Sequence, residues 1–146
     1  MRIYFGIGTN LGDREGNLRE AIRLLDERVG QQLACSSVYR SAPMGFVSDN
    51  EFANVVIAYE TTYSLEELLL ITQQIERELG RKEKSVNGIY HDRVIDIDLL
   101  QATDKQSLAE QITYTSDTLV IPHPRMQERD FVKIPLSEVE KQLGSN

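Results

Sequence analysis

The chain has 146 residues, of which 40% are hydrophobic and 27% are charged, and its formal net charge is −7. This length suits a single domain, 1–146, with a buried core, and the composition is too apolar for a disordered chain. The negative charge argues against general binding to nucleic acid or to an acidic membrane surface, because phosphate groups require a basic protein surface.

The first part of the chain predicts a strand, a helix and a second strand. Residues 2–8 are apolar and rich in β-formers, and residues 9–13 have the composition of a turn. Apolar residues then recur at helical spacing over 17–29, and Gly30 is a suitable helix stop. Residues 33–40 read as the second strand.

A third strand and a second helix follow a loop. Residues 41–50 hold proline, glycine and asparagine and predict a loop, whereas 52–62 are strand-like. Ser64 and Glu67 form a capping box, in which the hydroxyl and the carboxylate bond to backbone N–H groups at a helix start. We expect this helix to continue to Gly80.

The remainder of the chain has one strong strand among weaker signals. Residues 81–92 form a polar loop of a length that is often functional. The other expected elements are a strand at 94–102, a weak strand or turn at 104–115, an apolar run at 119–121, an extended turn at Pro122-His123-Pro124, a short helix or loop from Met126, and a closing segment at 131–140.

The order of these elements is β-α-β-β-α-β. This order is that of a ferredoxin-like α+β sandwich with a mostly antiparallel sheet. We expect both helices on one face of the sheet, which leaves the other face free for a ligand and for the active site.

Asp96 and Asp98 are the most informative residues of the predicted strand. They share one face, since side chains alternate along a strand, and lie roughly 7 Å apart. Two such carboxylates repel each other unless a cation lies between them, and ligands that offer only oxygen favour Mg²⁺. Arg93, three residues before Asp96, suits phosphate oxygens. A strand with a solvated acidic face is an equally good interpretation of this motif alone.

Two further features concern the location of the protein. Cys35 is the only cysteine, which excludes an intramolecular disulfide and fits a reducing cytoplasm. The N-terminus runs directly into the first strand pattern and does not resemble a signal peptide, and no apolar run approaches membrane-spanning length. We expect a cytoplasmic protein without a membrane partner.

Several motifs, spread along nearly the whole chain, resemble the 6-hydroxymethyl-7,8-dihydropterin pyrophosphokinase family. They are Gly8-Thr9-Asn10-Leu11-Gly12-Asp13, Ser37-Val38-Tyr39-Arg40-Ser41-Ala42-Pro43-Met44-Gly45, Phe52-Ala53-Asn54, Gln74-Ile75-Glu76 with Gly80-Arg81, Asp96-Ile97-Asp98-Leu99-Leu100, and Ile121-Pro122-His123-Pro124-Arg125-Met126 with Arg129 and Phe131. The resemblance implies an enzyme that moves a pyrophosphoryl group from ATP to a pterin alcohol in folate biosynthesis.

The resemblance also implies roles for individual residues. Asp96 and Asp98 match the carboxylates that hold two Mg²⁺ ions against the triphosphate, and with Arg81 and Arg93 they are the expected catalytic residues. The expected ATP-binding residues are Gln73, Glu76, Arg81, Arg93, His123 and Arg129. The expected pterin-binding residues are Ser41, Ala42, Pro43, Met44, Phe52, Asn54, Tyr90 and Phe131, of which Phe52 and Phe131 sandwich the ring.

Some residues of the 81–93 loop depart from the family pattern. Tyr90, His91 and Asp92 stand where the family usually has a Trp and a Gly-Pro pair, and Glu83 stands where a second arginine is frequent. A family member that binds pterin or nucleotide with altered or lost catalysis is therefore the alternative function. A small interaction module with an acidic face is a third interpretation.

Purely structural roles are also possible for several of these residues. Phe52 and Phe131 also suit a hydrophobic core, and His123 and Arg129 also suit a solvated surface. Arg81 at the end of a helix also complements the helix dipole. We expect a monomer whose partners are small molecules, since the sequence contains no long apolar edge or heptad seam.

Overall fold

A five-stranded antiparallel sheet organises the chain in the computed structural model, which describes residues 1–10, 12–41, 51–80, 95–104 and 110–144. The elements in chain order are β1 (Arg2–Thr9), α1 (Arg14–Arg28), β2 (Gln31–Cys35), β3 (Tyr39–Ser41), β4 (Phe52–Glu60), α2 (Leu65–Glu78), β5 (Asp96–Thr103), β6 (Tyr114–Thr115), β7 (Val120–Ile121), the 3₁₀ helix η1 (Met126–Glu128) and α3 (Asp130–Gly144).

The strand order of the sheet is β2-β4-β1-β5, and β3 pairs with the other end of β4. All of these pairs are antiparallel. The predicted βαββαβ order and the ferredoxin-like α+β class are confirmed. β6 and β7 form a separate two-stranded hairpin after β5.

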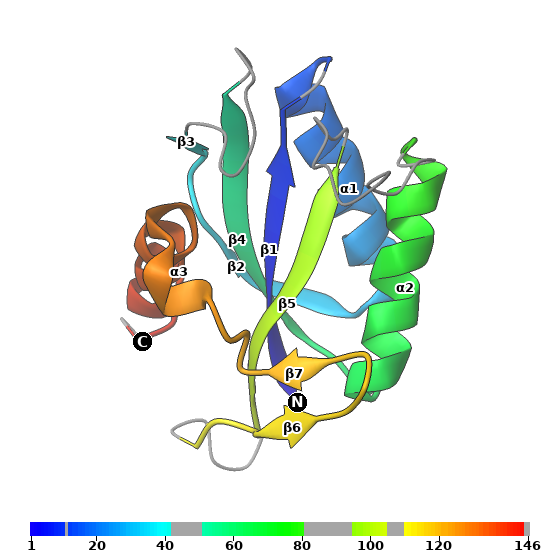
Figure 1. Cartoon of the computed structure of the whole chain (residues 1–146), viewed down its shortest axis with the longest axis vertical. Coiled ribbons are helices and arrows are strands. Elements are labelled where there is room, and N and C mark those ends of the chain that lie inside the picture. Colours follow the sequence, from blue (N-terminus) through cyan, green and yellow to red (C-terminus); the bar gives the residue numbers. More distant parts are fainter. Residues whose placement is uncertain (11, 42–50, 81–94, 105–109, 145–146) are drawn as a thin grey trace.

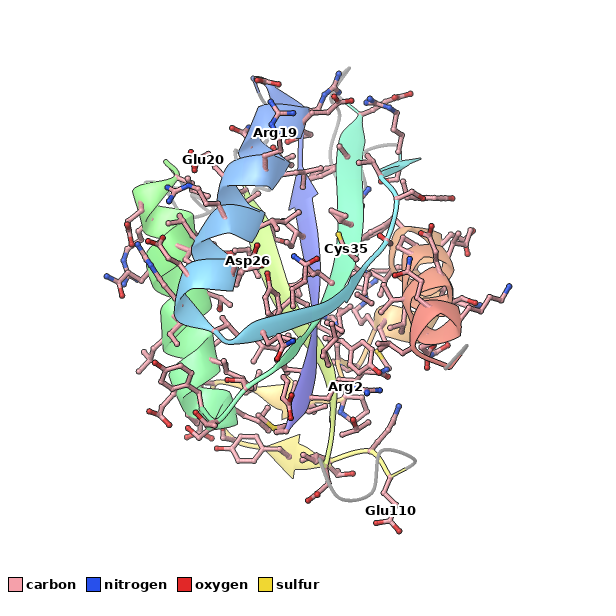
Figure 2. The ribbon with its side chains drawn as sticks, turned by 180° about the vertical axis from the view of Figure 1, so that it is seen from behind. Arg2, Arg19, Glu20, Asp26, Cys35 and Glu110 are labelled. Atoms are coloured by element: carbon pink, nitrogen blue, oxygen red, sulfur yellow. The ribbon has the colours of Figure 1, made fainter. Side chains whose placement is uncertain are left out.

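Helices α1 and α2 pack against one face of the sheet (Figure 1). The apolar side chains of β1 that point to this face are Ile3, Phe5 and Ile7, all at most 2% exposed. On β4, Tyr59 is also fully buried, and its hydroxyl donates a hydrogen bond to Asp26 of α1, which Figure 2 labels beside β2. The core of the protein therefore lies between the sheet and these two helices.

The opposite face is not free along its whole length, contrary to expectation, because α3 covers part of it (Figure 1). Val132, Leu136 and Val139 of α3 are buried against this face, where the sheet contributes Tyr4, Val56, Ala58 and Leu100 among others. Their spacing of four and three residues is helical. Among the described residues, the part of this face that α3 leaves open is thus the end of the sheet nearest Gly8.

A bulge in β5 lies at the border between the open and the covered parts. Tyr4 pairs with Gln101 and Phe5 pairs with Leu99, so Leu100 is the extra residue. A bulge bends a strand and re-aims the side chains that follow it. Leu100 packs into the α3 side of the core. The acidic side chains on this face of β5 therefore end at Asp98, because Leu100 lies where α3 begins to cover the sheet.

The segment predicted as one strand, 33–40, is two strands. Ser36 interrupts the ladder because its Oγ atom, in place of a backbone carbonyl, accepts the N–H of Val56 at 3.0 Å. The next residue is held by α3: Glu138 Oε2 accepts the N–H of Ser37 at 2.8 Å. The connection between β2 and β3 is therefore fixed by side chains instead of a continuous ladder.

Both long helices of the first layer begin at a side-chain cap. Asp13 Oδ1 accepts the N–H of Gly16 at 3.0 Å, so α1 starts three residues earlier than its apolar pattern suggests. At α2 the predicted capping box of Ser64 and Glu67 is confirmed. Gly80 follows α2 with φ of 107°, a conformation that favours glycine.

The β6–β7 hairpin is attached to the first turn of α2. Glu66 Oε1 accepts hydrogen bonds from Tyr114, Ser116 and Thr118 at 3.0, 2.8 and 3.1 Å. These bonds, that of Ser116 first, lower the pKa of Glu66. The position of α2 therefore also fixes the hairpin that leads to His123.

Among the described residues, no helix is both long and apolar enough to span a membrane.

Replacement of Ser64 by alanine tests the α2 cap. We expect Ser64→Ala to lower the free energy of unfolding by about 1 kcal/mol, because the N–H of Glu67 loses its acceptor. Urea unfolding followed by circular dichroism measures this change. Thr62→Ala, at an exposed hydroxyl two residues away, is the control. Equal stability of the two variants would contradict the prediction.

Candidate functional site

The acidic pair of β5 lies on the open face of the sheet. Asp96 and Asp98 are half-buried, whereas Ile95, Ile97 and Leu99 point into the core beneath the helices. Side-chain alternation along the strand therefore brings both carboxylates to the face that α1 and α2 do not cover. Both aspartates have further interactions within the protein.

Two glycines of β1 separate the acids from the polar residues of β4. Gly8 pairs with Asp96 on one side and with Asn54 on the other. Gly6 likewise pairs with Asp98 and with Val56. Neighbouring strands lie about 4.8 Å apart, so Asp96 and Asn54 are roughly 10 Å apart across the sheet at their Cα atoms. No side chain of β1 stands between them.

Asn54 and Phe52 lean over Gly8. A Cβ atom at Gly8 would lie 3.0 Å from Oδ1 of Asn54 and 3.6 Å from Cδ1 of Phe52. Asn54 is only 5% exposed, and Phe52 is partly exposed and belongs to neither of the two core clusters. The position of Phe52 therefore favours a contact role over a core role.

Ser41 lies beside these residues because β3 pairs with β4. Ser41 is paired with Phe52, and Tyr39 is paired with Asn54. The side chains of Ser41, Phe52 and Asn54 consequently share the open face. The Asn54 amide donates hydrogen bonds to the carbonyl of Tyr39 and to the hydroxyl of Ser41 at 3.1 and 2.9 Å.

Glu76 supports the acidic strand from α2. Its side chain is 8% exposed, and Oε2 accepts the backbone N–H of Ile97 at 2.8 Å. Ile97 is the residue between the two aspartates, and β5 ends the β2-β4-β1-β5 path of the sheet. The buried carboxylate therefore satisfies a backbone N–H group at the edge of the sheet. It holds β5 at the position between the two aspartates.

His123 lies close to the acidic pair. Its backbone N–H donates to the carbonyl of Leu100 at 2.7 Å, which joins it to the bulge of β5. Burial, followed by the charge of Arg129, lowers the pKa of His123, and the charge of Asp96 opposes this change. His123 Nδ1 accepts the N–H of Arg125 at 3.2 Å. The neutral ring therefore carries its proton on Nε2 and has one donor to offer.

Arg129 is a cation with unused donor capacity. Its Nε atom is buried, and no hydrogen-bond acceptor for it lies among the described residues. The guanidinium carbon lies 5.7 Å from the ring centroid of Phe131. Phe131, at the start of α3, is half-buried and packs against the apolar cluster between α3 and the sheet. A half-buried guanidinium whose Nε atom has no acceptor among the described residues is suited to an anionic ligand.

The remaining predicted residues differ in how they are placed. Gln73 is exposed on α2, one turn before Glu76. Six predicted site residues lie outside the described part of the chain: Ala42, Pro43, Met44, Arg81, Tyr90 and Arg93. The structure thus places Asp96, Asp98, Asn54, Ser41 and Phe52 on one face of the sheet, with His123 near Asp96.

The described residues contain no cluster of three or more histidine, cysteine, aspartate or glutamate side chains that would hold a metal by itself. Asp96 and Asp98 supply two carboxylates. Mg²⁺ is commonly bound by one or two carboxylates, substrate phosphates and water, whereas Zn²⁺ usually has three or four protein ligands. This donor set fits Mg²⁺ that arrives with a phosphorylated ligand.

Gly6 and Gly8 are the site residues that sequence reasoning missed. They alternate with the buried Phe5 and Ile7, so the same period-two pattern that identifies the strand assigns both glycines to the open face. Two glycines on one face of a central strand signal close approach by another group.

The chain has clear relatives among known proteins. A family model described as 7,8-dihydro-6-hydroxymethylpterin-pyrophosphokinase matches residues 4–141. A 2-amino-4-hydroxy-6-hydroxymethyldihydropteridine pyrophosphokinase of Porphyromonas gingivalis is 45% identical over 137 residues, which cover 94% of this chain and 89% of the relative. The Bacillus subtilis protein of the same name is 38% identical over 141 residues, 96% of this chain and 78% of that protein.

A solved structure shares the fold. It is the crystal structure of an HPPK-DHPS protein in complex with substrates, and the superposition has a TM-score of 0.68 with 13% sequence identity. The match covers 97% of this chain and 40% of the other chain. At this identity the likeness concerns the fold alone.

Replacement of Glu76 tests its support of β5. We expect Glu76→Ala to accelerate hydrogen exchange of the Ile97 amide and to lower the free energy of unfolding by about 1–3 kcal/mol, because an edge N–H group loses its acceptor. Glu76→Gln keeps an acceptor oxygen and should change both quantities less. Amide exchange followed by NMR measures the effect, and unchanged exchange at Ile97 in Glu76→Ala would contradict it.

The pKa of His123 is testable by NMR titration. We expect a value below 6.5 in the folded protein and a partial rise in Arg129→Gln, since burial remains when the neighbouring charge is removed. The unfolded chain then binds a proton before the folded chain does, so this histidine reduces stability as pH falls below about 6.5. A folded-state pKa at or above that of the urea-unfolded chain is the contrary result.

Proposed function

Because this chain belongs to the 7,8-dihydro-6-hydroxymethylpterin-pyrophosphokinase family, we propose that it transfers the pyrophosphoryl group of ATP to 6-hydroxymethyl-7,8-dihydropterin. The products are AMP and the pterin diphosphate, and the reaction belongs to folate biosynthesis. One observation supports this proposal above the others: Asp96, Gly8 and Asn54 form a cross-strand row on the open face. This row would join a phosphate-binding side, at Asp96, to a ring-binding side, at Asn54.

Asp96 and Asp98 form the metal-binding part of the proposed site. Their two carboxylates fit Mg²⁺ bound together with a triphosphate, and we expect two ions. When bound between Asp96 and Asp98 and the triphosphate, Mg²⁺ would supply positive charge that stabilises the negative charge developing during transfer. The protein contributes the spacing of the two carboxylates, which β5 and Glu76 keep fixed.

The ATP-binding side is proposed to contain His123 and Arg129. The buried Nε atom of Arg129 gains an acceptor if a phosphate oxygen binds there, and the neutral His123 donates through Nε2. Gln73, Arg81 and Arg93 complete this proposed side. Glu76 already accepts the Ile97 N–H, so its proposed contribution is to hold β5 in place.

The pterin-binding side is proposed to contain Phe52 and Phe131 as stacking groups. A pterin is a flat bicyclic ring with one polar edge, which two aromatic faces and polar side chains can recognise. Asn54 and the backbone near Ser41 are proposed to contact that edge. Ala42, Pro43, Met44 and Tyr90 belong to the same proposed subsite.

The reaction itself is a displacement at phosphorus. The pterin hydroxyl oxygen forms a bond to the β-phosphorus, and the bond from that phosphorus to the oxygen bridging to the α-phosphate breaks. AMP leaves with that oxygen, and the hydroxyl proton is released to solvent, a step that bound Mg²⁺ and one carboxylate of the pair would jointly ease. Catalysis is then mainly positioning and charge stabilisation, in which Arg81 and Arg93 are proposed to take part.

The protein is also proposed to act as a cytoplasmic monomer. The single cysteine, Cys35, is partly buried, and burial raises the pKa of its thiol, which fits an unreactive side chain.

The decisive experiment measures AMP formation. We expect AMP release from ATP that requires both Mg²⁺ and the pterin alcohol, and a loss of roughly 10²–10³-fold in Asp96→Asn and in Asp98→Asn, the scale for removing one preorganised electrostatic group. Asp117→Asn, at an exposed position of the hairpin, is the matched control and should retain activity.

Two other results would point elsewhere. Tight pterin binding without AMP formation would favour the alternative function, a binding protein with lost catalysis, which the unusual 81–93 loop suggests. Absence of both pterin and ATP binding would sink the proposed function.

A further inference from the structure

The Asn54 side chain has a fixed hydrogen-bonding polarity. Nδ2 lies 3.1 Å from the carbonyl oxygen of Tyr39, and a carbonyl oxygen only accepts. The opposite amide orientation would place two acceptors against each other. The carbonyl therefore determines which end of the amide is nitrogen.

Ser41 takes the second proton of the same amide. Its Oγ atom lies 2.9 Å from Nδ2, and a third contact, to the carbonyl of Phe52, is longer at 3.5 Å. An amide nitrogen carries two protons, so the two shorter bonds use both. The side chain of Asn54 therefore has no N–H group left for a ligand.

The acceptor end of Asn54 points toward the site. Oδ1 is the atom that would lie 3.0 Å from a Cβ at Gly8, and none of the described residues donates a hydrogen bond to it. Oδ1 has no such donor and yet is not a fully buried atom, so it keeps some exposure on the open face of the sheet. The absence of a side chain at Gly8 leaves room for a ligand atom at this oxygen.

We propose that Ser41 is a positioning residue that fixes Asn54 as a pure hydrogen-bond acceptor, so that the site selects a heterocycle edge that presents an N–H group. The inference rests on the proposed function and deepens it, because it assigns the direction of the bond through which the ring is recognised. Ser41 acts through Asn54: without its hydroxyl the amide loses one of its two bonds and can rotate.

Kinetics with matched variants test this role. We expect Ser41→Ala to raise KM for the pterin alcohol roughly three- to tenfold, the scale of one lost hydrogen bond, with KM for ATP unchanged. Ser41→Thr keeps the hydroxyl and should stay close to wild type. Ser37→Ala is the control, because it removes a serine hydroxyl of the β2–β3 connection that contacts Glu138 instead of Asn54.

NMR of the side-chain amide reports the polarity directly. In wild type both Nδ2 protons of Asn54 should exchange slowly, and in Ser41→Ala one of them should exchange fast, with Asn54→Ala providing the assignment. Addition of the pterin alcohol to wild type should leave both protons bonded to the protein. A large shift of one Nδ2 proton on binding would mean that Asn54 donates to the ring, and would overturn the inference.

The failure of this inference is distinguishable from failure of the proposed function. If wild type binds the pterin and forms AMP while Ser41→Ala matches it in KM and in amide exchange, only the positioning role is lost. If wild type neither binds the pterin nor forms AMP, the proposed function fails and this inference fails with it.

Discussion

Burial of one face of β5 determines the position of the acidic pair. Ile95, Ile97 and Leu99 must lie beneath the helices to complete the core, and the alternation of a strand then leaves Asp96 and Asp98 no other face than the open one. The same alternation in β1 puts Phe5 and Ile7 in the core and Gly6 and Gly8 opposite. Core packing and site geometry are therefore two results of one register, and a slip of one residue would destroy both.

The site is supported from several elements instead of being carried by one loop. Glu76 of α2 holds the N–H between the aspartates, the bulge at Leu100 receives the backbone N–H of His123, and β3 orients Asn54. Each support uses a hydrogen bond from a buried or partly buried group, where the loss of a partner is costly. The arrangement is consistent with a reaction in which positioning and charge do most of the catalysis.

Sequence patterns predict the structure correctly where local signals agree, and they fail where tertiary contacts override those signals. The capping box at Ser64 and the alternation around Asp96 predict their structures directly. Helix α3 was not predicted, because Pro135 lies within it and disfavours a helix interior, whereas packing of its apolar stripe against β4 outweighs that cost. The break at Ser36 depends on its hydroxyl replacing a carbonyl toward Val56, a contact between residues twenty positions apart. The orientation of Asn54 likewise depends on β3, which no local pattern specifies.

The glycines of β1 make the floor of the proposed site out of main chain. A methyl group at Gly8 would crowd Asn54, and one at Gly6 would lie 3.3 Å from Cδ1 of Leu100. A larger residue at Gly8 or Gly6 would displace the side chain of Asn54 or Leu100 before it changed the main chain that a ligand contacts. A ligand that rests on these glycines contacts main-chain atoms, whose chemistry is the same whatever the sequence, so differences in ligand selectivity are expected from the side chains around them.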